Sequence, residues 1–392
     1  MSEAAIVGVG ATPYYRRGRS EPQTVLEMAG KAILAATEDA GLAIEDLDGF
    51  AYFMGGLDTA LLAQTLGVPE VRFTASLTGG GGGSAGSVGL AAAAVTTGMA
   101  DVVVSVMSLQ QSRQRLGAAF LPTRGGAYPS EPTPELDFLL PSGLLAPGHS
   151  FALITQRYIH RYGATREQLG EVALAARANA RRRPTALRTE ALTLDDYLAA
   201  PMVADPLCLF DFCLESDGAV AVITTSLERA GGTRHRPVRV LASAHGGAGA
   251  WGQAIRGLAM PDGIFATSGH GPVAKQLYGA AGVQPDDVDV ALLYDHFTSM
   301  VLMQLEDYGF CAPGEAGPFV QDGHIRWPDG GLPVNTHGGN LSEAYIVGMT
   351  HVKEAVEQLR GTAVNQVADA EVALVTGGPA QIPVSGLLLG RG

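Results

Sequence analysis

Near its C-terminal end the chain reads Asn335-Thr-His-Gly-Gly-Asn-Leu-Ser-Glu-Ala-Tyr345-Ile-Val-Gly348. Glycines surround a single tyrosine in this stretch, and a buried tyrosine most often serves packing with one satisfied hydroxyl. To act as a base instead, a phenol of unperturbed pKa about 10 needs a nearby positive charge or hydrogen bonds that favour the phenolate. His337 is a candidate for that tuning, and Asn340 and Glu343 are candidates for orienting Tyr345.

A second aromatic stretch, Tyr294-Asp-His-Phe297, precedes it along the chain. If this segment enters a pocket as a strand, Tyr294 and His296 share one face and Asp295 points to the other. We therefore expect Asp295 to be structural and bonded to backbone. His296 is a second candidate for tuning a phenol, and for both histidines a neutral core ring is the alternative.

The composition bounds the class of protein. A chain of 392 residues with 46% hydrophobic composition can bury a large core and is long enough for two domains. A formal charge of -13 argues against a nucleic-acid partner, because phosphate neutralisation requires a basic surface. The N-terminus has an acidic residue where a signal peptide would be basic, and the longest apolar run, residues 86–100, reads as a buried helix rather than a membrane span. The expected location is the cytoplasm.

The chain has three cysteines, without the spacing of metal ligands. We expect Cys208, Cys213 and Cys311 to be small buried hydrophobes and predict no metal site.

A weak internal repeat indicates two halves. Gly41, Asp46 and Asp48 recur as Gly282, Asp287 and Asp289 at one constant offset. In each copy an alanine-rich helix ends at the glycine and an apolar strand follows the acidic turn. We predict an N-terminal half over residues 1–232 and a C-terminal half over residues 233–392.

The predicted elements alternate between strands and helices. A strand at residues 4–10 has its echo at 238–243, and one at 102–106 has its echo at 372–376. Such alternation implies an α/β protein with parallel or mixed sheets covered on both faces. Ser20 is the predicted cap of the first helix. Residues 110–151 are rich in Pro and Gly and helical signal returns from 151 to 182, so a loop domain of about 110–182 is expected over a functional surface.

These motifs resemble the thiolase superfamily, whose members carry N-x-x-G-G followed by G-H-P-x-G near the C-terminus. Asn335, Gly338, Gly339 and Gly348 keep that spacing, and Tyr345 occupies the histidine position. The resemblance extends over nearly the whole chain. It implies a thiolase fold of two pseudo-repeated αβαβα halves, with a loop-rich insertion in the first half.

Both catalytic cysteines of the family are missing. The nucleophile's position falls on Gly81 within the run Gly79 to Gly83, and the late cysteine's position falls on Val375. Covalent acyl transfer by the usual route is therefore excluded, because neither side chain has a thiol. The glycine run is not a phosphate loop, since no Gly-Lys-Ser/Thr follows. The glycines either permit a close turn or, together with Gly377, form an oxyanion hole that is retained although the nucleophile is missing.

An arginine run ends the helical region of the loop domain. It comprises Arg177, Arg181, Arg182 and Arg183 and is most simply a solvated helix end. The resemblance gives it another role, since this region of thiolases holds coenzyme A. Arg177 and Arg181, with Asn340, are the predicted substrate-binding residues. We predict no cofactor of the chain's own, because the substrate carries the coenzyme A.

Within the superfamily the chain is most similar to the sterol-carrier, lipid-transfer branch, and there to the actinobacterial steroid side-chain aldolases. The shared phrases are Leu293-Tyr-Asp-His-Phe-Thr298, Gln304-Leu-Glu-Asp-Tyr-Gly-Phe-Cys311 and Glu343-Ala-Tyr-Ile346. The resemblance implies retro-aldol cleavage of a β-hydroxyacyl-CoA on a steroid side chain, giving a short acyl-CoA and a steroid ketone or aldehyde. Tyr294 and Tyr345 would transfer the protons, with base and acid left unassigned.

The resemblance also implies partners. We expect a homodimer that pairs through an edge strand near residues 71–77, joined by a small protein with an OB fold and a zinc ribbon. Two other functions stay open: a thiolase-like acyltransferase or condensing enzyme, and a non-catalytic subunit that binds acyl-CoA.

Overall fold

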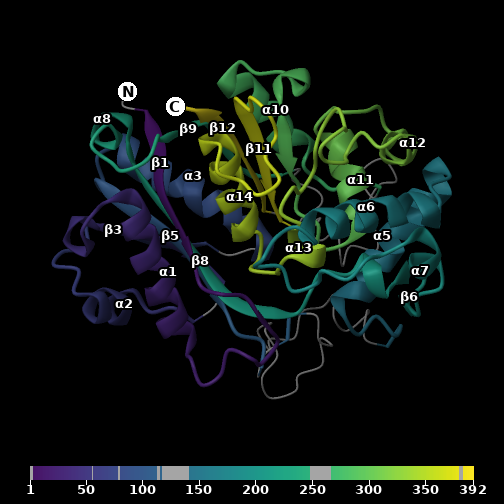
Figure 1. Cartoon of the computed structure of the whole chain (residues 1–392), viewed down its shortest axis with the longest axis horizontal. Coiled ribbons are helices and arrows are strands. Elements are labelled where there is room, and N and C mark those ends of the chain that lie inside the picture. Colours follow the sequence, from purple (N-terminus) through teal and green to yellow (C-terminus); the bar gives the residue numbers. More distant parts are fainter. Residues whose placement is uncertain are drawn as a thin grey trace.

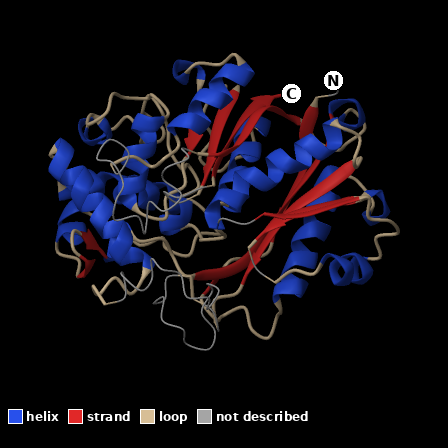
Figure 2. Ribbon diagram, turned by 180° about the vertical axis from the view of Figure 1, so that it is seen from behind, coloured by secondary structure: helices blue, strands red, loops and turns tan. Residues whose placement is uncertain are grey.

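The computed structural model describes residues 3–54, 56–77, 80–112, 115–116, 141–247, 266–378 and 383–392. One large mixed sheet crosses the molecule, with strand order β10-β11-β12-β9-β1-β8-β5-β3-β4 and with β2 pairing β8 (Figures 1 and 2). Parts of the expected loop domain, residues 113–114 and 117–140, lie outside the described residues.

The sheet consists of two similar halves that meet where β1 pairs antiparallel with β9. Outward from this junction the first half runs β1, β8, β5, β3, β4 and the second runs β9, β12, β11, β10. The strands span Ala4–Ala11 (β1), Tyr15–Arg16 (β2), Gly49–Phe53 (β3), Phe73–Leu77 (β4), Val102–Leu109 (β5), Ser216–Ser226 (β8), Val238–Gly246 (β9), Val290–Leu292 (β10), Val372–Gly377 (β11) and Val384–Arg391 (β12). The strands that echo one another in sequence, β1 with β9 and β5 with β11, hold equivalent places.

Helices form three layers around the two half-sheets. The inner helices α3 (Gly83–Thr96) and α14 (Met349–Arg360) contact strands of both halves. The outer helix α1 (Val25–Ala40) covers the first half and α10 (Gly271–Ala281) the second (Figure 1). The αβαβα layering confirms the predicted fold class, whereas the boundary between residues 232 and 233 stays a prediction.

A helical lobe lies beside the second half (Figure 1). Its helices are α5 (Pro147–Tyr162), α6 (Arg166–Ala180), α7 (Leu194–Leu198), α11 (Thr298–Asp307), α12 (Ala316–Gln321) and α13 (Gly339–Ser342), with the hairpin of β6 (Met202–Ala204) and β7 (Leu207–Cys208). The predicted helical region 151–182 consists of two helices. Gly163 ends α5 with φ 72°, and Thr165 starts α6 with a reciprocal cap to Gln168.

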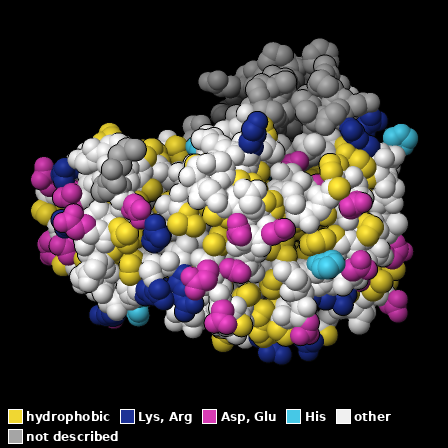
Figure 3. Space-filling model, turned by 90° about the horizontal axis from the view of Figure 1, so that it is seen from above, with side chains coloured by type: hydrophobic (Ala, Val, Ile, Leu, Met, Phe, Trp, Pro, Cys, Tyr) yellow, Lys and Arg dark blue, Asp and Glu magenta, His cyan; other side chains and the backbone are white. Residues whose placement is uncertain are grey.

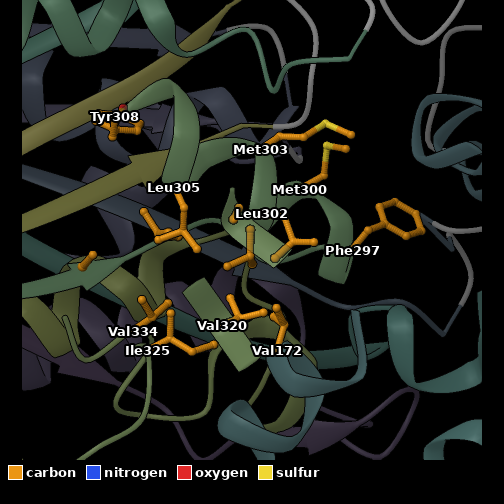
Figure 4. Close-up of a cluster of buried hydrophobic side chains, with 14 of the residues drawn as sticks. Val172, Phe297, Met300, Leu302, Met303, Leu305, Tyr308, Val320, Ile325 and Val334 are labelled. Carbon is orange, nitrogen blue, oxygen red and sulfur yellow. The ribbon is translucent and has the colours of Figure 1, made fainter. Parts of the chain in front are cut away.

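The lobe is anchored by α11, which begins directly after Phe297. Its buried side chains Met300, Leu302, Met303 and Leu305 lie in one apolar cluster (Figure 4). Other members of the cluster are Val172, Val320, Ile325 and Val334. Because core packing resists displacement, α11 fixes the segment that carries Tyr294.

Two smaller expectations need correction. The first helix is capped by Thr24, whose side chain accepts from the Glu27 N–H, while the Ser20 hydroxyl donates to Asp217 at 2.9 Å. Of the three free cysteines only Cys208 is fully buried; Cys213 and Cys311 are partly exposed.

The surface and edges bear on partners. Acidic and basic side chains are interspersed over the described part of the face in Figure 3. No described helix combines the length and apolar character that crossing a bilayer requires. Strand β4 ends the strand order, so it is an edge strand of the sheet as expected; the homodimer stays a prediction.

Candidate active site

The structure brings the two tyrosines together. Tyr294 follows β10 and leads into α11, whereas Tyr345 lies in the loop between α13 and α14. Their hydroxyl oxygens are 3.0 Å apart. Tyr294 is 1% exposed and Tyr345 is half-buried, so Tyr345 is the less enclosed of the two residues.

A closed set of hydrogen bonds holds the Tyr294 backbone. Its N–H donates to the Thr376 hydroxyl at 2.8 Å, and that hydroxyl donates to the Gln304 side chain at 2.5 Å. The Gln304 side-chain amide in turn donates a hydrogen bond to the Tyr294 carbonyl at 2.9 Å. The set ties Tyr294 to β11 and α11 at once, and sequence reasoning missed both Thr376 and Gln304.

The Tyr345 backbone is held by one side chain at the start of β8. Its N–H donates to the Ser216 hydroxyl at 2.8 Å, and the same hydroxyl donates to the Tyr345 carbonyl at 3.1 Å. Two residues later Val347 has φ 49°, a left-handed conformation that strains a β-branched residue. The loop is therefore held in shape by its surroundings.

Glycine at position 81 makes room for Tyr294. A β-carbon on Gly81 would overlap the Tyr294 hydroxyl and lie 2.8 Å from Cε2 of its ring. A β-carbon on Gly348 would also lie 2.8 Å from Cε2. The phenol therefore occupies the space where a side chain at position 81 would begin, which is the position of the thiolase nucleophile in the sequence resemblance.

The two predicted oxyanion glycines are neighbours. A β-carbon on Gly377 would lie 3.0 Å from the Gly81 carbonyl oxygen. The glycine run also makes close contacts of its own, since a β-carbon on Gly82 would lie 2.9 Å from the Pro383 carbonyl carbon. The close-turn interpretation is thus supported for Gly80 to Gly83; Gly79 lies outside the described residues, and the oxyanion hole stays a prediction.

Burial controls the charge of the site. Burial, and next the neighbouring Tyr345, raise the pKa of Tyr294 well above its ordinary value, so this phenol is a proton donor at neutral pH. Burial lowers the pKa of His296 to about 3 and that of His337 well below its ordinary value. The expectation that either ring supplies a positive charge is therefore corrected: both are neutral.

The predicted polar residues take different places. The His296 ring lies 5.1 Å from the Tyr294 ring between centroids, whereas His337 lies 4.8 Å from His351. Asn340 is fully buried. Within the described structure the ring nitrogens of both predicted histidines and the side-chain amide of Asn340 have no hydrogen-bond partner.

Asp295 is structural, as predicted. It accepts from the N–H groups of Asn340 at 2.8 Å and Leu341 at 3.3 Å, and it contacts the His351 ring nitrogen at 3.1 Å.

The arginine run divides into buried and exposed members. Arg177 is buried and donates to the Ser342 hydroxyl and the Glu190 carbonyl, so its predicted contact with a phosphate is corrected. Arg181 is exposed and remains a candidate. Arg183 is not solvated as expected: it is 5% exposed and bonded to the carboxylates of Glu343, Glu354 and Glu357. The acidic residues around Tyr345 were the available signal for this cluster.

Comparisons with known proteins agree with the fold. Residues 252–383 match the family "Thiolase C-terminal domain-like". The chain is 40% identical to the 17-hydroxy-3-oxo-4-pregnene-20-carboxyl-CoA lyase of Mycobacterium tuberculosis, over 99% of both chains. It is 41% identical to the steroid side-chain-cleaving aldolase of Thermomonospora curvata, over 99% of this chain and 97% of that one. A solved structure described as "Ltp2-ChsH2(DUF35) aldolase" superimposes with a TM-score of 0.90 and 38% identity, over 100% of this chain and 98% of that one.

The fold and the layered halves define a member of the thiolase superfamily. At this identity and coverage, the chain belongs to that superfamily's family of steroid side-chain-cleaving aldolases.

Proposed function

We propose that the chain cleaves a β-hydroxyacyl-CoA on a steroid side chain by a retro-aldol reaction, releasing a steroid ketone or aldehyde and a short acyl-CoA. The names of the two relatives with 40% and 41% identity support this class of reaction. The observation that carries the proposal is the tyrosine pair. The Tyr294 hydroxyl occupies the space where a β-carbon at position 81 would lie, and it is 3.0 Å from the Tyr345 hydroxyl.

The chemistry needs a base, a proton donor and a place for negative charge, but no nucleophile. Tyr345, the less buried of the two tyrosines, takes the proton from the substrate hydroxyl. The bond between the carbinol carbon and the α-carbon breaks, the carbinol becomes a carbonyl, and the bonding electrons form a thioester enolate. The proton that Tyr345 accepted then passes to the α-carbon, so that the tyrosine is restored and the reaction balances without free coenzyme A or water.

The neighbouring groups support these roles. Tyr294 remains protonated and can donate to the Tyr345 oxygen, which favours the phenolate on Tyr345. The Gly81 and Gly377 N–H groups hold the enolate oxygen. His296 and Asn340 serve the substrate as neutral hydrogen-bonding groups, because buried polar atoms without partners are costly unless a ligand satisfies them.

The proposed assembly is a homodimer with a small OB-fold and zinc-ribbon protein. The structural relative is described with a second component, ChsH2 (DUF35), which supports a second subunit. The chain is proposed to need no resident cofactor, since the substrate brings its own coenzyme A.

The test is product analysis by mass spectrometry. The chain, co-expressed with an OB-fold partner, is incubated with a panel of steroid β-hydroxyacyl-CoA thioesters, with and without free coenzyme A. The proposal expects equimolar steroid carbonyl compound and short acyl-CoA at a rate independent of free coenzyme A. Cleavage that consumes free coenzyme A would show a thiolytic enzyme, and no cleavage of any member would favour a binding subunit.

A further inference from the structure

A buried cluster of charges lies beside the loop that carries Tyr345. The Arg183 guanidinium donates to Glu343 at 2.9 Å, to Glu354 at 2.8 Å and to Glu357 at 3.3 Å. Glu343 belongs to the loop, two residues before Tyr345, whereas Glu354 and Glu357 belong to α14. One side chain thus joins the end of the α6 region to both elements that flank the tyrosine.

The chain after Arg183 also grips the same loop. The Thr185 hydroxyl donates to Glu343 at 2.8 Å, and the Leu187 N–H donates to the Glu343 carbonyl at 2.9 Å. The Arg188 N–H donates to the Ser342 carbonyl at 3.1 Å. These contacts act just before the strained Val347, so they help to hold a conformation that the loop would not adopt alone.

The charges explain why Arg183 is decisive. The carboxylates of Glu343, Glu354 and the partly buried Glu357 share this region with the cations of Arg183 and Lys353, and among the described residues Lys353 forms its ion pair with Glu357. Glu354 is fixed by the Thr336 hydroxyl at 2.6 Å and the Gln358 amide at 3.1 Å. Without Arg183, Glu343 loses its cationic partner and is repelled by the neighbouring carboxylates. A charge left without its partner in a buried pair is strongly unfavourable, so we expect Glu343 to move.

We propose that Arg183 is a positioning residue for the reaction, which holds the Tyr345 hydroxyl beside that of Tyr294 by fixing Glu343. This proposal rests on the proposed function, because it assigns a catalytic effect through Tyr345. It predicts that loss of Arg183 lowers kcat only when residue 345 carries a hydroxyl.

The test is a double-mutant cycle on turnover. Arg183→Met is measured in the natural chain and in a Tyr345→Phe background, with the partner protein present. In the natural chain we expect kcat to fall about 100-fold with KM changed less than about 3-fold; in the Tyr345→Phe background the same substitution costs less than about 3-fold. Arg183→Lys restores part of the lost kcat, because it returns a cation.

Arg360 provides the matched control. Its side chain is as buried as that of Arg183 and pairs with Asp39 at 2.7 Å and the Val7 carbonyl at 2.8 Å, at the far end of α14. Arg360→Met lowers the thermal midpoint while kcat stays within about 3-fold of the natural value. If Arg183→Met does not fold, Glu343→Gln replaces it in the cycle with the same expectation.

The outcomes are distinguishable. Equal losses in both backgrounds, an equal loss of kcat in Arg360→Met, or natural kcat in Glu343→Gln would overturn the positioning role. If Tyr345→Phe itself keeps full aldolase turnover, the tyrosine chemistry of the proposed function fails instead.

Discussion

The Tyr294 hydroxyl occupies the space into which the side chain of any residue but glycine at position 81 would extend. The two positions are therefore interdependent: a cysteine at 81 and a tyrosine at 294 cannot both keep these places. This contact gives a steric reason why position 81 holds no side chain while Tyr294 occupies this place.

Gly81→Ala tests this steric relationship. The added methyl group overlaps the phenol, so we expect the thermal midpoint and kcat to fall, with a loss of about 1–3 kcal/mol in unfolding free energy as for other overpacked cores. The loss should shrink in a Tyr294→Leu background, which removes the hydroxyl. Gly279→Ala in α10 is the control, since a β-carbon there meets nothing within 4 Å. Natural stability and turnover in Gly81→Ala would refute the relationship.

Thr376→Val tests the hydrogen-bond set that holds Tyr294. The valine leaves the Tyr294 N–H buried without its acceptor, at a cost of about 1–3 kcal/mol in unfolding free energy. Because Tyr294 is then less firmly held, kcat should also fall. The control is Thr225→Val on β8, which removes a hydroxyl that donates to the Asp101 carbonyl. We expect Thr225→Val to lower stability and spare kcat; equal effects of both variants on kcat would contradict the assigned role.

The buried histidines predict acid lability. Burial lowers the folded-state pKa of His270 and His296 to about 3 and lowers that of His337 well below its ordinary value, whereas an unfolded histidine titrates near pH 6.5. The unfolded chain therefore binds more protons between about pH 3 and 6.5, and stability that is present above pH 6.5 is lost as the pH falls through this window. Each ring contributes a slope of about 1.4 kcal/mol per pH unit. Burial raises the pKa of Asp307 to about 6, so the folded chain binds a proton there as the pH falls below 6. This gain in stability offsets the loss caused by about one histidine ring.

Urea unfolding between pH 5 and 7.5 measures this slope. His337→Gln should reduce it by the contribution of about one proton, whereas a substitution of the exposed His160 should leave it unchanged. An unchanged slope in His337→Gln would mean that the ring is not held neutral in the folded protein.

The sequence predicted the fold from local signals and the tyrosine pair from its resemblance to a known family. Glycine-terminated helices, apolar strands and turn residues are short-range patterns that predicted the fold, whereas the resemblance to thiolases implied that Tyr294 and Tyr345 lie on catalytic positions of the family. The 3.0 Å contact between their hydroxyls agrees with that placement.

The errors share one physical cause, which is contact between residues far apart in the chain. Ser20 fits a helix cap, but its hydroxyl is taken by Asp217, so Thr24 caps the helix instead. From the sequence, Arg183 is expected at a solvated helix end. In the structure it is buried and pairs with three carboxylates, one from the loop before α14 and two from α14 itself. From the sequence, His296 and His337 are candidates for a positive charge beside a phenol. Their burial, which depends on the packing of the whole core, keeps both rings neutral.

The turnover numbers of Tyr294→Phe and Tyr345→Phe on a steroid β-hydroxyacyl-CoA test the central claim most directly. Each change removes one hydroxyl and leaves the ring, and Tyr278→Phe, which removes a hydroxyl bonded to the Tyr308 carbonyl, is the matched control. With unfolding midpoints as references, we predict that kcat falls about 10²–10⁴-fold in either variant, no further in the double variant, and not in the control. Turnover within a few-fold of the natural chain in either variant would contradict catalysis by the tyrosine pair.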